Sequence, residues 1–142
     1  MSHALRHLHL GRIAAAALLL AGFAGVAVAQ PETREDRAMS ATFHHCMDAA
    51  GGVDPDMRDC LSAEYLRWDA ALNQTYRSLM ARRSPAAQAA LRREERAWLR
   101  STRVRCEHAG DDNAGGTAQV LEIDDCYLTS RVARTLDLRA RR

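Results

Sequence analysis

Six apolar side chains recur at helical spacing in the middle of this 142-residue chain. They stand four, three, four, four and three residues apart: Leu61, Tyr65, Trp68, Leu72, Tyr76 and Leu79. A stripe with this period is one face of an α-helix. It predicts a helix of about six turns over residues 60–82, capped at its start by Asp59, with Trp68 buried on the apolar face.

A second long helix should follow after a tight turn. Ser84 suits the N-cap and Pro85 the first helical position, so we expect this helix to run to about Cys106 with Trp98 largely buried. The composition of residues 108–117 is that of a loop, and a third helix should cover 118–138. The sequence therefore predicts an all-α domain, an antiparallel helical hairpin with a third helix packed on it.

An arginine interrupts the core-facing side of the second helix. Trp98, Arg103 and Cys106 fall roughly on one side of it. In an antiparallel hairpin of this length, residues whose numbers sum to about 168 lie at the same level. Arg103 is then level with Tyr65 and one turn from Asp69. We therefore predict that Arg103 is partly buried, paired with Asp69 and stacked on an aromatic ring, which is a structural role.

The amino terminus has the pattern of a secretory signal peptide. Arg6 and Arg12 precede an uncharged run over residues 13–28, and Ala27, Val28 and Ala29 form a small-x-small cleavage pattern. The run is short for a membrane span, and an uncleaved anchor is the alternative. Three segments are predicted: a signal peptide over residues 1–29, a disordered leader over 30–41 and a helical domain over 42–142. The mature protein is then periplasmic or secreted.

Charge is balanced overall but segregated along the chain. The precursor has a net charge of +2, and the predicted signal peptide carries two of its arginines, so the remainder is near neutral. This balance gives no support to a nucleic-acid partner or to a stable membrane anchor after cleavage. Residues 82–105 hold eight arginines and two glutamates, a local +6. Residues 107–125 hold six carboxylates and no arginine or lysine, a local −6 with His108 neutral.

All four cysteines follow the predicted signal peptide, and an even count in an oxidising compartment indicates two disulfides. Two pairings compete. The hairpin brings Cys60 and Cys106 to the same end, which allows a bridge between them with Cys46–Cys126 as its companion. Each neighbouring pair, however, flanks a glycine-bearing loop, which favours Cys46–Cys60 and Cys106–Cys126.

Several blocks of the sequence together resemble the LprI-type family of small exported bacterial proteins. The resemblance covers Cys46 to about Leu138 and rests on these residues: Asp69, Leu72, Asn73 and Tyr76, then Ala97, Trp98, Arg103 and Cys106, then Gly115, Gly116 and Thr117, and finally Cys126. Two positions depart from the family pattern, because Glu95 stands where glutamine is usual and Arg131 where threonine is usual. The last helix therefore matches the family pattern less closely than the other blocks do.

The resemblance implies an all-helical, disulfide-bonded fold and, for the namesake of the family, inhibition of lysozyme. Proteins resembling this family often carry the first cysteine pair as a self-contained unit. Together with the loop argument, this leads us to predict the bridges Cys46–Cys60 and Cys106–Cys126. The predicted core and ion-pair residues are Tyr65, Trp68, Asp69, Asn73, Tyr76, Trp98 and Arg103. Tyr65 and Trp68 come from the apolar stripe, and the other five also match the family blocks.

No pattern in the sequence supports catalysis, a metal or a cofactor. His44 and His45 precede Cys46, but that cysteine is needed for a disulfide, and no C-x-x-C spacing occurs. Glu94 and Glu95 are adjacent on a helix, so they point to different sides and cannot flank a scissile bond. We therefore predict that the protein is not an enzyme.

Two binding functions remain open. In the first, the acidic loop enters the cleft of a cationic lysozyme, using Asp111, Asp112, Asn113, Gly115, Gly116 and Thr117; the alternative is a solvated disulfide loop. In the second, the protein is a periplasmic stress or chaperone-like protein that binds partners through exposed apolar surface. An extended apolar patch would favour the second, and a well-covered fold with an exposed acidic loop would favour the first.

Overall fold

The computed structural model describes residues 31–141, and this part of the chain is helical without strands. Its elements in order are α1 (Arg34–Ala38), α2 (Ala41–Ala50), α3 (Asp54–Met80), α4 (Pro85–Glu107), the 3-10 turn η1 (Asp111–Asn113) and α5 (Thr117–Arg139). The predicted all-α class is confirmed, as are both predicted bridges, Cys46–Cys60 and Cys106–Cys126. The predicted signal peptide lies outside the described residues.

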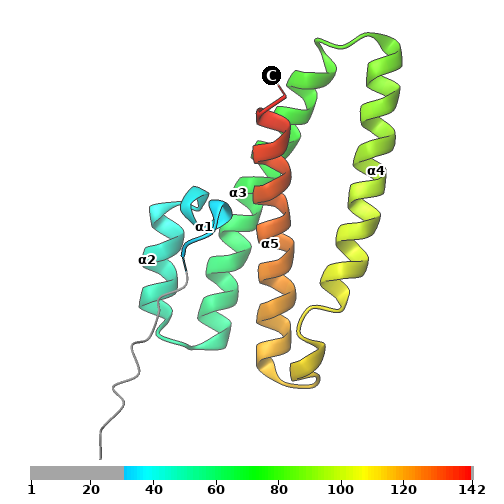
Figure 1. Ribbon diagram of the computed structural model, residues 1–142. Coiled ribbons are helices and arrows are strands. Elements are labelled where there is room, and N and C mark those ends of the chain that lie inside the picture. Colours follow the sequence, from blue (N-terminus) through cyan, green and yellow to red (C-terminus); the bar gives the residue numbers. More distant parts are fainter. Residues whose placement is uncertain (1–30, 142) are drawn as a thin grey trace, which may run out of the picture. The chain divides into compact units, whose positions relative to one another are not determined.

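Helix α5 is the centre of the packing. It lies along α3 and also contacts α4, whereas α4 and α3 make few direct contacts (Figure 1). One buried cluster joins Trp68 of α3 to Leu128 and Val132 of α5. A second joins Leu79 of α3, Leu91 of α4 and Leu138 of α5. The apolar surface buried in these two clusters supplies the hydrophobic contribution to stability. The predicted pair of antiparallel helices is present, but the third helix packs between its two arms rather than across them.

The turn between α3 and α4 follows the sequence pattern closely. The Ser84 hydroxyl accepts a hydrogen bond from the Ala87 backbone N–H, and Pro85 is the first helical residue. The Gln88 side chain donates to the backbone carbonyls of Met80 and Arg83, which fastens the turn. The predicted boundaries of α4 and α5 are confirmed to within a residue or two.

The amino-terminal side of the domain differs from the prediction. The segment expected to be a disordered leader contains α1, whose N-cap Thr33 forms a reciprocal capping box with Asp36, and Met39 is buried in the core. The disordered-leader prediction is therefore wrong for residues 33–41. The physical reason is that apolar Met39 and the Ser40 cap both have partners on the later helices, which local composition does not reveal.

Helix α3 begins earlier than predicted, at Asp54 rather than near residue 60. Its N-cap is Val53, which makes no side-chain cap bond, and Pro55 lies in the first turn. The prediction of Asp59 as the cap is therefore wrong. Two extra turns of α3 lie beside α2, and the Cys46–Cys60 bridge joins the two helices there.

Candidate functional site

The loop between α4 and α5 is held at both ends and within. Cys106 at the end of α4 is fully buried and bonded to Cys126 of α5. Inside the loop, the Asn113 amide donates to Glu122 at 2.7 Å, and the Gly115 N–H donates to the Gln119 side chain at 3.0 Å. The segment is therefore tied to the first turns of α5 at several points. Asn113 has its amide engaged in holding the loop.

Gly110 makes this compact turn possible, and sequence reasoning missed it. Its φ is +78°, a region that side chains disfavour. A Cβ there would lie 2.6 Å from the Glu122 carboxylate and 3.0 Å from the Gln119 Cα. The predicted Gly115 also has a positive φ, of +81°, but a Cβ there would meet open space. The close approach that needs a glycine is therefore at Gly110.

The predicted loop residues from Asp111 to Thr117 are all exposed. Asp111 Oδ2 lies 3.1 Å from His108 Nδ1. The Asp112 carboxylate forms no hydrogen bond or ion pair with any described residue. The loop therefore presents carboxylates to solvent on a fixed backbone. This is the arrangement that a charged protein-binding surface requires.

An open groove of about 910 Å³ lies next to this loop, between the first turns of α3 and the first half of α5. Tyr65 and Tyr127 contribute to its walls, and Asp54, Asp59 and Asp124 bring carboxylates to it. Arg58 Nε donates to Asp124 Oδ2 at 2.8 Å. The α2–α3 and α4–α5 connections lie at the same end of the helices (Figure 1). We call this region, residues 54–59 and 107–125, the acidic end.

The cation that lies among the predicted core aromatic residues is Arg131 rather than Arg103. Arg131 Nε is 3.1 Å from Asp69 Oδ1, and its guanidinium lies 5.3 Å from the Tyr65 ring and 5.1 Å from the Trp98 ring. Its Nη2 donates to the Tyr65 hydroxyl at 2.9 Å. The predicted pairing of Arg103 with Asp69 is wrong, because α5 stands between the helices that carry them.

Arg103 itself points to solvent. It pairs with Glu107 one turn later at 2.8 Å, and 72% of its side chain is exposed. Hydrogen bonding and attraction from Glu107 raise the pKa of Arg103.

Four of the other predicted core and ion-pair residues lie together. Asp69, Asn73, Tyr76 and Trp98 line one small hollow with Arg131. Asn73 donates to the backbone and side chain of Asp69 at 2.9 Å. Trp98 has intermediate exposure and packs against the buried cluster of Leu79, Leu91 and Leu138.

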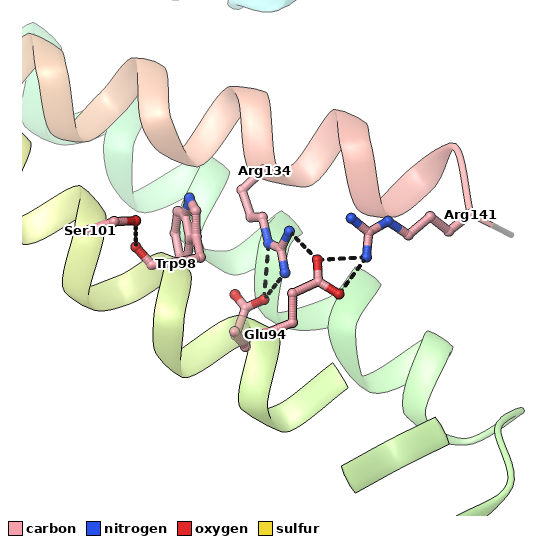
Figure 2. Close-up of polar contacts among 6 residues, drawn as sticks. Glu94, Trp98, Ser101, Arg134 and Arg141 are labelled. Atoms are coloured by element: carbon pink, nitrogen blue, oxygen red, sulfur yellow. Dashed lines mark hydrogen bonds and ion pairs between the residues drawn. The ribbon is translucent and has the colours of Figure 1, made fainter. Parts of the chain in front are cut away.

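A second arginine of α5 holds α4 in place. Arg134, of whose side chain 7% is exposed, binds Glu94 and Glu95 at 2.9 and 2.7 Å, and Arg141 also binds Glu94 (Figure 2). Burial raises the pKa of Glu94, but the hydrogen bonds from Arg134 and Arg141 outweigh it, so the net shift is downward. Glu95, the departure from the usual glutamine, thus has a charged partner on α5.

Glu64 is a further buried carboxylate that the sequence did not mark. It accepts hydrogen bonds from the Ser40 N–H and hydroxyl at 2.8 Å and from the Trp68 indole at 3.0 Å, and it pairs with Arg67. Through these bonds it joins the start of α2 to α3. Arg67 and Trp68 are one helical turn away, but Ser40 lies 24 residues earlier in the chain, so local sequence gave no sign of that contact.

Within residues 31–141, no group of three or more histidine, cysteine, aspartate or glutamate side chains is placed to hold a metal ion. His44 and His45 are exposed on α2, and Cys46 is in its disulfide. In the same residues, no helix is both long enough and apolar enough to cross a membrane.

Comparison with known proteins points to one family. No curated protein and no solved structure matches the chain. A family model described as lysozyme inhibitor LprI matches residues 46–138, which span both disulfides and the helices from α3 to α5. The two disulfides and the family are those of an exported protein. With most of the described residues inside the match, the chain belongs to the lysozyme inhibitor LprI family.

Proposed function

We propose that this protein binds and inhibits a cationic lysozyme after export, through its acidic end. Membership of the lysozyme inhibitor LprI family is the observation that carries the proposal. An inhibitor acts by occupying the enzyme, so the chain needs a docking surface and no catalytic group of its own. Export into the periplasm or the medium brings it into contact with enzymes that attack the cell wall.

The charge of the acidic end suits such a partner. Residues 107–125 contribute −6, and residues 54–59 contribute three aspartates and one arginine, a further −2. Asp56, Asp59, Asp111, Asp112 and Glu122 are all exposed. Complementary potentials of this kind steer two proteins together and align them on contact. The acidic end is therefore the surface most suited to a basic enzyme.

The rigidity of the loop also favours binding. A loop that is already ordered loses little conformational freedom when a partner binds it, so more of the contact energy appears as affinity. The Cys106–Cys126 bridge and the Asn113–Glu122 and Gly115–Gln119 hydrogen bonds supply that order. The Thr117 side chain, exposed at the start of α5, is a polar group within reach of a bound partner.

The chaperone-like alternative requires an extended apolar surface. The large apolar side chains that remain exposed in residues 31–141 are Val53, Leu66, Leu99, Val104 and Val120. They are spread over the start of α3, its middle, two sides of α4 and the start of α5. Scattered exposed apolar residues are normal for a soluble protein. No feature of the described residues favours the chaperone-like function.

A lysozyme turnover assay on cell-wall substrate tests the proposal. The oxidised protein should lower turnover in a dose-dependent manner. Replacing Asp111 and Asp112 by asparagine should weaken inhibition by about tenfold, because it removes two exposed charges and little packing. The matched control, Glu32→Gln with Asp137→Asn, removes two exposed charges outside the acidic end and should inhibit as the natural protein does. Full enzyme turnover at a large molar excess of oxidised protein would refute the proposal.

A further inference from the structure

Five arginines of α4 lie on one side of that helix. Each residue advances about 100° around the axis of an α-helix. With Arg92 placed at 0°, the angular positions of Arg103, Arg96, Arg100 and Arg93 are about 20, 40, 80 and 100°. All five are exposed. The buried residues of α4 lie on the other side, with Leu91, Thr102 and Cys106 at about 260, 280 and 320°. We call these five residues, Arg92, Arg93, Arg96, Arg100 and Arg103, the arginine face.

The arginine face keeps most of its charge unneutralised. Arg103 pairs with Glu107, and the other four form no ion pair with any described residue. Glu94 and Glu95, the other acidic residues of α4, are turned toward α5, where they bind Arg134 and Arg141 (Figure 2). The ion pairs that hold α4 in place therefore also remove these two carboxylates from the outer side, and Glu107 is the acidic residue of α4 that stays among the arginines.

Two exposed apolar side chains border this surface. Leu99 lies at about 340° and Val104 at about 120° on the same scale, one on each side of the arginines. Their exposed fractions are 45% and 58%. Arginine flanked by apolar side chains suits the boundary of a lipid bilayer, where the charges meet phosphates and the apolar groups meet the upper acyl region.

We propose that the arginine face binds the surface of a membrane that contains anionic phospholipids. The guanidinium groups pair with headgroup phosphates, which accept their planar fork of hydrogen bonds. The absence of aromatic residues from this face disfavours single-stranded nucleic acid, which binds by stacking. Export places the protein beside such membranes. The binding is peripheral and reversible.

Vesicle sedimentation with the exported, oxidised protein tests this proposal. The protein should sediment with vesicles of phosphatidylglycerol and phosphatidylcholine, but not with vesicles of phosphatidylcholine alone. Sedimentation should be lost at about 0.5 M salt, which screens the attraction. Replacing Arg96 and Arg100 by glutamine should weaken partitioning by about 30-fold, since each arginine near an anionic surface contributes about fivefold.

The matched control is Arg37→Gln with Arg77→Gln, which removes two exposed arginines from α1 and α3 and should change partitioning far less. Circular dichroism should show the same helix content in both variants, since arginine and glutamine have similar helix propensities. Inorganic phosphate at equal ionic strength should compete no better than chloride, because the target is a surface and not a single anion.

Four outcomes would overturn the proposal. They are equal sedimentation with both kinds of vesicle, an equal loss in the control variant, tighter binding to duplex DNA than to anionic vesicles at the same salt, and self-association that the Arg96 and Arg100 substitutions abolish. The last would show that the arginine face meets the acidic end of a second copy.

Discussion

Arg131 joins three helices through one guanidinium group. It belongs to α5, pairs with Asp69 and Tyr65 of α3 and lies over Trp98 of α4, with 17% of its side chain exposed. Replacing it by alanine should destabilise the fold by about 2 kcal/mol, less than a fully buried pair would cost because Asp69 remains partly hydrated.

Arg103→Ala is the matched control for that measurement. Its exposed pair with Glu107 should be worth less than about 0.5 kcal/mol, since solvent screens it. Urea unfolding of both variants compares the two arginines directly. A larger loss of stability for Arg103→Ala than for Arg131→Ala would contradict the assignment.

Glu64 should make folding sensitive to acid. Burial raises its pKa, but hydrogen bonds from Arg67 and Ser40 outweigh this and lower the pKa from 4.5 to about 2. The unfolded chain therefore binds the proton more tightly than the folded protein does. The stabilisation, on the order of 3 kcal/mol, is fully present above about pH 4.5 and is lost as the pH falls toward 2.

Glu64→Gln tests this dependence. Urea unfolding should show a lower stability for the variant at pH 6, and the difference between variant and natural protein should shrink steadily below about pH 4.5. Asp112→Asn, at an exposed residue, serves as the control and should show no such convergence. A difference between Glu64→Gln and the natural protein that stays constant from pH 6 to pH 3 would show that Glu64 is not held ionised by its partners.

At the scale of elements, each disulfide serves a different connection. Cys46–Cys60 joins α2 to α3, and Cys106–Cys126 closes the acidic loop between α4 and α5. Replacing Cys106 and Cys126 by alanine should cost about 3 kcal/mol in the chain-entropy model. It should also speed hydrogen exchange at the Gly115 amide, whose bond to Gln119 depends on the loop staying in place.

The corresponding variant of Cys46 and Cys60 is the control. It should lose a similar amount of stability and leave exchange at Gly115 unchanged, because its bridge lies in another connection. If both variants accelerate exchange at Gly115 equally, the loop is not held by its own bridge.

The helix boundaries near Ser84 could be predicted because the signals are local, a hydroxyl cap followed by proline. The position of α5 could not be predicted in the same way. Its buried residues occupy a wide arc and include polar ones: Leu128, Ser130, Val132, Arg134, Thr135 and Leu138. A helix that packs on two sides with polar groups shows no clean apolar stripe. We predicted Arg103, rather than Arg131, beside Asp69 because matching residues by their level in the hairpin assumes that α3 and α4 contact each other directly. In the structure α5 lies between them.

The exposure of the loop residues in the candidate site could be predicted from composition alone. Acidic and glycine-rich composition marks an exposed loop whatever its conformation, so Asp111 and Asp112 were placed correctly. The need for glycine at Gly110 was not predictable, because it arises from contact with Glu122 and Gln119 of the next helix. The disulfide pairing became predictable only when loop composition and family resemblance were combined.

At the scale of the whole domain, opposite charges gather in two regions that adjoin at Arg103 and Glu107. The acidic end gathers the carboxylates of residues 54–59 and 107–125, and α4 presents its arginines along one side. Ion pairs between α4 and α5 keep Glu94 and Glu95 out of the arginine face. The two proposed contacts, with a cationic partner and with an anionic surface, use different residues.

The rate at which the oxidised protein associates with a cationic lysozyme tests the central claim most directly. Stopped-flow measurement at low and at high salt should show a rate that falls by about tenfold or more as salt screens the acidic end. Asp111→Asn with Asp112→Asn should lower the low-salt rate and flatten its salt dependence, while Glu32→Gln with Asp137→Asn should leave both unchanged. No detectable complex, or a rate indifferent to salt and to the loop substitutions, would contradict recognition of lysozyme by the acidic end.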